Sequence, residues 1–82
     1  MIMSVDIYTE ARIIQDMLVS EGHGDRARRL KSAIDQGSTG SEILMALRFE
    51  IDQIIPLPNL SELVRLKLDM LRKEISSALG GP

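Results

Sequence analysis

The stretch STGSEILMALRFEIDQIIPLP, residues 38–58, decides the fold because it holds a helix start and a helix stop. Thr39 followed three residues later by Glu42 matches a capping box, and Ser41 is an alternative cap. Pro56 ends the helix, because it has no N–H to donate and restricts the backbone of the residue before it. We therefore expect a helix over residues 41–55.

Between these signals the apolar residues recur at helical spacing. On a wheel with about 100° per residue, six of them fall within about 120° of one another. They are Ile43, Leu44, Leu47, Ile51, Ile54 and Ile55. Such a stripe is typical of a helix that buries one face against other helices.

The same combination of a stripe and a stop recurs on both sides of this segment. Glycines at 22, 37 and 80 follow three further stretches that carry apolar residues every three or four positions, which predicts helices over 6–21, 25–36 and 60–79. Asp25 can cap the second of these helices, and Asn59 or Ser61 the last. No stretch alternates apolar and polar residues as a strand does. We expect one all-α domain: a four-helix bundle, or two packed antiparallel helical hairpins.

Composition excludes several classes of protein. The 82 residues include no cysteine, so disulfides and thiolate metal sites are absent. The formal charge of −2 does not favour a phosphate polymer as partner. Residues 1–6 have no basic segment typical of a signal peptide, and no uncharged stretch has the length of a membrane span. We expect a cytoplasmic protein that does not enter a membrane.

No group of residues predicts catalysis. The single histidine, His23, has no cysteine or second histidine to share a metal, and we interpret it as a solvated turn residue. Residues 37–41 resemble a phosphate-binding turn but lack the lysine of a P-loop, which leaves anion binding there an open question. Glu50 flanks the apolar stripe, where we expect it to pair with a Lys or Arg. We predict no enzyme, no cofactor and no metal.

Three of the expected helices carry apolar residues outside their main stripe. A simple four-helix bundle would leave these side chains in water, unless its helices cross steeply and use wider faces. The candidates for an interface are Ile13, Met17, Met45, Phe49, Leu63, Leu66 and Met70. The pattern predicts a non-enzymatic interaction or regulatory module that forms a homodimer, with Phe49, Leu63, Leu66 and Met70 near the centre of the contact.

Two alternatives remain open at this point. Small acidic helical chains of this size also include inhibitors and immunity-type proteins that cover the surface of another protein, an analogy of size and class only. The segment 25–36 is basic, and a nucleic-acid-associated module could use it as a patch. That patch comprises Arg26, Arg28, Arg29 and Lys31. The acidic balance and the shortage of aromatic residues argue against nucleic acid.

Overall fold

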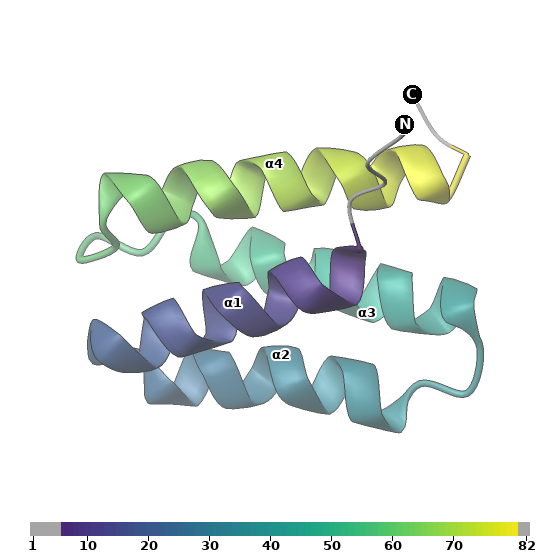
Figure 1. Ribbon diagram of the computed structural model, residues 1–82, viewed down its shortest axis with the longest axis horizontal. Coiled ribbons are helices and arrows are strands. Elements are labelled where there is room, and N and C mark those ends of the chain that lie inside the picture. Colours follow the sequence, from purple (N-terminus) through teal and green to yellow (C-terminus); the bar gives the residue numbers. More distant parts are fainter. Residues whose placement is uncertain (1–5, 81–82) are drawn as a thin grey trace.

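The computed structural model describes residues 6–80, which form four α-helices. They are α1 (Ile7–Ser20), α2 (Gly24–Gln36), α3 (Gly40–Ile54) and α4 (Glu62–Ala78). Successive helices run in opposite directions (Figure 1). Each helix packs against its neighbours in the chain, and α4 returns to pack against α1, whereas the diagonal pairs stay apart. The prediction of an all-α four-helix bundle is confirmed.

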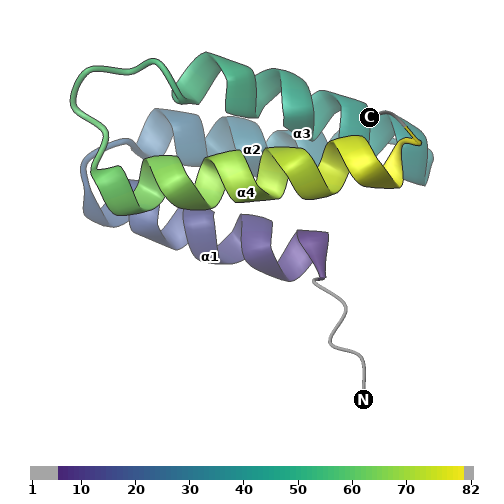
Figure 2. The same cartoon turned by 90° about the horizontal axis from the view of Figure 1, so that it is seen from above.

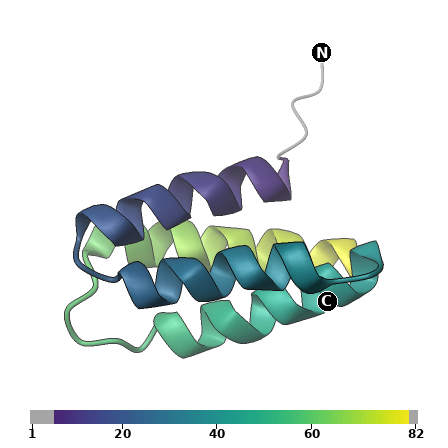
Figure 3. The same cartoon turned by 90° about the horizontal axis from the view of Figure 1, so that it is seen from below.

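Two further views show how the four helices surround one core. Seen from above, α4 lies in front between α1 and α3 (Figure 2), and seen from below, α2 takes that position (Figure 3). Every observed helix begins and ends within two residues of the expected bounds. The largest difference is at the start of α4, where Ser61 is the N-cap and Asn59 is left in the loop. No helix in the described part of the chain has both the length and the apolarity needed to cross a membrane.

Side chains cap three of the four helices. Asp6 accepts hydrogen bonds from the Tyr8 N–H (3.1 Å) and the Thr9 hydroxyl (2.7 Å) at the start of α1. The Thr9 bond is the main reason that the pKa of Asp6 lies below its ordinary value. Thr39 accepts from the Glu42 N–H at the start of α3, and Ser61 accepts from the Val64 N–H at the start of α4.

The start of α2 differs from the prediction. The N-cap residue is His23, which makes no capping hydrogen bond through its side chain. Asp25, the expected cap, lies inside the first turn and pairs there with Arg28. Its negative charge still lies near the helix N-terminus, where the helix dipole favours it.

The core is entirely apolar, and no polar or charged residue is buried in the described part of the chain. Each helix contributes buried residues from one face, as the periodicity predicts. The buried side chains are Ala11, Ile14, Leu18, Ala27, Leu30, Leu47, Ile51, Ile54, Leu60, Val64, Leu68, Leu71 and Ile75. All of them are Ile, Leu, Val or Ala, so the buried core consists of branched aliphatic side chains and alanine methyl groups.

Polar contacts fasten the α1–α2 turn to the α3–α4 loop at one end of the bundle. The Glu21 carboxylate accepts from the Ser61 N–H (3.2 Å) and from the Ser61 hydroxyl (2.6 Å). His23 Nε2 donates to the Asn59 carbonyl at 3.3 Å. His23 is therefore a partly buried turn residue that joins the two connections, and this hydrogen bond is a contact that the sequence did not predict.

Candidate functional site

The outward face of α4 carries an apolar stripe. Leu63, Leu66 and Met70 lie at i, i+3 and i+7, so they share one side of the helix. Their exposed fractions are 55, 56 and 57%. The core-facing residues of α4 lie on the opposite side, where Val64, Leu68, Leu71 and Ile75 are buried. The helix is thus apolar on two faces, and the bundle covers only one of them.

Helix α1 adds to this surface beside α4. Glu10 lines a pocket of about 190 Å³ together with Lys67, Met70, Leu71 and Glu74 of α4. Ile13 lies one turn beyond Glu10 on the same side of α1 and is 41% exposed. At the far end of the two helices, Glu21 bonds Ser61. Ile13 is therefore held beside the α4 stripe.

Met17 departs from the prediction. The sequence pattern places it among the interface candidates, in the same relation to the main stripe as Ile13. In the structure it is half-buried and packs against the core. The reason is that α1 packs against both α2 and α4, so its buried face is wider than one narrow stripe. We define the α4 surface as Leu63, Leu66 and Met70 with Ile13 at its edge.

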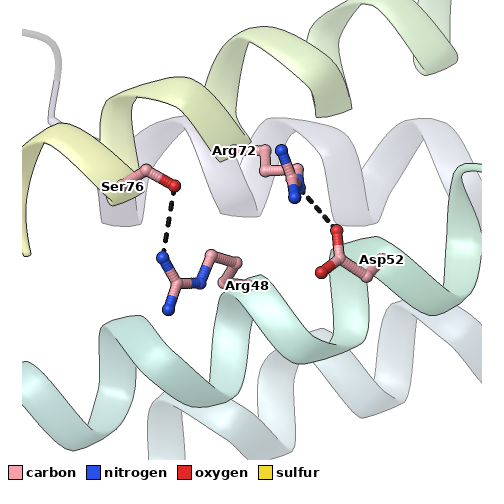
Figure 4. Close-up of polar contacts among 4 residues, drawn as sticks. All are labelled: Arg48, Asp52, Arg72 and Ser76. Carbon is pink, nitrogen blue, oxygen red and sulfur yellow. Dashed lines mark hydrogen bonds and ion pairs between the residues drawn. The ribbon is translucent and has the colours of Figure 1, made fainter. Parts of the chain in front are cut away.

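Phe49 and Met45 form a second exposed pair on α3, with exposed fractions of 60 and 55%. Beside this pair, polar side chains of α3 contact α4 (Figure 4). Arg48 of α3 donates to the Ser76 hydroxyl of α4 at 3.3 Å, and Arg72 of α4 pairs with Asp52 of α3 at 2.5 Å.

These contacts also fix how far Phe49 lies from the α4 surface. Because Arg48 is level with Ser76 and Asp52 with Arg72, the antiparallel register places Phe49 level with residue 75. Leu66 is nine residues earlier, which corresponds to about 13.5 Å along the axis of α4. Phe49 and Leu66 are thus offset from each other along the helices, and the Arg48–Ser76 and Asp52–Arg72 contacts lie level with the Phe49 end of this span. One contact that holds Phe49 together with Leu63, Leu66 and Met70 stays a prediction.

Two exposed hydrophobic residues, Tyr8 and Val19, are not among the predicted interface candidates. Val19 is 60% exposed and lines a shallow pocket between α1 and α2 with Lys31. The sequence does indicate that Val19 is exposed, because it follows the buried Leu18 and therefore lies about 100° away on the wheel, outside the stripe. It has no apolar partner at helical spacing that is comparably exposed, so it makes no stripe of its own.

The basic patch of α2 is interrupted by acidic residues. Arg28 pairs with Asp25, and Lys31 pairs with Asp35 at 2.7 Å. Arg29 lines the groove between α2 and α3, which also holds the carboxylates of Glu42 and Glu50. Arg26 is half-buried near the α1–α2 turn. The four basic side chains thus do not form a uniformly positive surface of the kind that attracts phosphates.

Glu50 lacks the ion pair that we expected. Its Oε1 atom is buried and has no hydrogen-bond partner, and none of the ion pairs in the described residues includes it. Arg28 and Arg29 line the same groove as Glu50, but neither forms an ion pair with it. An unpaired buried carboxylate oxygen costs stability, so this position is an energetic weakness of the α2–α3 contact.

Two N–H groups at the turn of residues 37–41 are bonded to side chains of the same turn. The Glu42 carboxylate accepts from the Ser38 N–H at 3.0 Å, and Thr39 accepts from the Glu42 N–H at 3.2 Å. A bound anion would have to displace a carboxylate that already carries negative charge at this place. Among residues 6–80 no three His, Asp or Glu side chains are grouped so that they could hold a metal ion.

The exposed apolar side chains are therefore the feature of this surface that core packing does not explain. These side chains are apolar and carry no reactive group. The function that they support is therefore contact with another apolar surface. A scan against models of protein families finds no match, and searches of curated proteins and of solved structures find none either.

Proposed function

We propose that this chain is a small, non-enzymatic interaction module that works as a homodimer in the cytoplasm. The observation that supports the proposal is the α4 surface. Three successive outward positions of one helix hold large aliphatic side chains, each more than half exposed. Scattered single apolar residues are normal on protein surfaces, but a continuous stripe beside a second helix is typical of a contact site.

The exposed area sets the expected strength of the contact. Full burial of one such side chain contributes about 1.5–3 kcal/mol, and about half of this remains to be gained at a half-exposed position. Two copies contribute eight side chains, so the total is roughly 6–12 kcal/mol. The loss of translational and rotational freedom costs about 4–15 kcal/mol. The two terms are comparable, and we expect a dimer that dissociates on dilution.

The test is the mass of the protein in solution by light scattering or sedimentation equilibrium over a series of concentrations. The wild type should pass from monomer to dimer as concentration rises. Leu66→Glu should remain monomeric with unchanged helical circular dichroism, because it places a charge in the centre of the contact. Val19→Glu is the matched control, since Val19 is as exposed but lies outside the α4 surface. A wild type that stays monomeric throughout would contradict the proposal.

The Met45–Phe49 pair supports a second candidate function. Since it lies apart from the α4 surface, it is available to a different protein, as in an inhibitor or immunity-type protein that covers the surface of its target. Capture of partners on the immobilised protein should then depend on Phe49 and not on Leu66. A Phe49→Glu variant that captures the same proteins as the wild type would exclude this function.

A further inference from the structure

The α4 surface has the symmetry that a contact between two identical helices requires. In a two-fold contact the same patch faces itself, so each residue must meet a suitable residue on the opposite side of the axis. Leu63 and Met70 lie at equal distances in sequence on either side of the point between Leu66 and Lys67. If two α4 helices lie antiparallel with the axis near Leu66, each Leu63 meets Met70 of the second copy, and the two Leu66 side chains meet each other.

The charges on one flank of the stripe fit this arrangement. Glu62 and Lys73 are eleven residues apart, which places them about 20° from each other on the wheel, on the side of the stripe that faces α3. Both are exposed. Lys73 pairs with Asp69 at 3.2 Å, while none of the ion pairs in the described residues includes Glu62. In the antiparallel arrangement Glu62 of each copy lies beside Lys73 of the other, at both ends of the contact.

A parallel arrangement would lose this complementarity. It would place the two Glu62 side chains at the same level but on opposite flanks of the contact, and likewise the two Lys73 side chains, so that no Glu62 would lie beside a Lys73 of the other copy. On the other flank, Lys67 lies near the axis and shares its pocket with Glu10 and Glu74 of the same copy. The carboxylates of Glu10 and Glu74 in each copy therefore offset the electrostatic repulsion between the two Lys67 side chains.

We infer that the second copy of this chain docks with its α4 antiparallel to the first, about a two-fold axis near Leu66, with Glu62 and Lys73 of opposite copies paired. This inference rests on the proposed homodimer. It names the partner of the α4 surface and the direction in which that partner lies.

Charge reversal tests the direction. Glu62→Lys alone should place two lysines together at both ends and weaken the dimer about tenfold at low salt, and Lys73→Glu alone should do the same with two carboxylates. An equimolar mixture of the two variants should regain dimers, because in the mixed dimer both ends again carry opposite charges. The double variant Glu62→Lys/Lys73→Glu should also regain them.

The outcomes separate this inference from the proposed function. If the wild type never dimerises, both fail. If the wild type dimerises and Leu66→Glu abolishes the dimer, but mixing the two single variants recovers nothing, the contact exists and the antiparallel arrangement is wrong. Circular dichroism and urea unfolding of each single variant control for folding, and a folding defect in either variant could not be repaired by mixing.

Discussion

Arg65 is the side chain that holds the α3–α4 loop in place, and its removal should destabilise the bundle. Its guanidinium donates to the carbonyls of Ile55, Leu57 and Leu60. Ile55 is the C-cap residue of α3, and the other two residues lie in the loop that follows. Hydrogen bonds from a charged donor contribute about 1.5–3 kcal/mol. Since Leu57 is only half-buried and its neighbours Pro56 and Pro58 are exposed, water can replace some of these bonds. We expect a total loss of about 2–3 kcal/mol for Arg65→Met.

Methionine is the appropriate replacement, because it keeps much of the apolar stem and removes only the donors. The matched control is Arg72→Met on the same helix, where the lost partner is the exposed Asp52 and the expected cost is below about 1 kcal/mol. Arg65→Lys should recover part of the loss, since a single ammonium cannot reach three carbonyls as the planar guanidinium does.

Urea unfolding followed by far-ultraviolet circular dichroism measures these differences as shifts of the midpoint at constant slope. Equal costs for Arg65→Met and Arg72→Met would refute the reasoning, and so would a cost below about 0.5 kcal/mol for Arg65→Met, given the bonds expected to be lost.

Two further pairs of variants probe the packing of α3 and its start. Leu47→Ala, at a fully buried position, should cost about 2–5 kcal/mol in urea unfolding, whereas Phe49→Ala should cost less than about 1 kcal/mol because its ring is mostly in water. Similar costs would mean that the buried face of α3 is wrongly assigned. Gly37→Ala should destabilise by about 1–3 kcal/mol, because a Cβ there would overlap the Ile43 side chain and press on its backbone. Gly40→Ala meets nothing within 4 Å and should stabilise by about 0.4–1 kcal/mol, so a gain in stability from Gly37→Ala would contradict the close approach.

The features that the sequence predicted are those with local causes. The bounds of α3 follow from the Thr39 cap and from Pro56, and both act within a few residues of the chain. The outward orientation of Phe49 follows in the same way from its place on the wheel. Val19 could have been found by the same reasoning, although an isolated valine gives a weak signal.

The features that the sequence did not predict depend on how the helices pack. Whether Phe49 and Leu66 share one surface is decided by the register of α3 against α4, which Arg48 and Asp52 set through contacts with residues more than 15 positions away. The burial of Met17 depends on α4 lying beside α1. The missing partner of Glu50 likewise depends on where the side chains of α2 come to lie, which no pattern within α3 contains.

The two ends of the bundle differ in the number of hydrogen bonds that join separate connections. We therefore expect local unfolding to begin at one end. At one end Glu21 and His23 tie the first hairpin to the loop before α4. At the opposite end the hydrogen bonds of the α2–α3 turn, such as Ser38 to Glu42, stay within that turn. Local unfolding of the native state should therefore start at the turn between α2 and α3 and spread toward the end where Glu21 and His23 join the two connections.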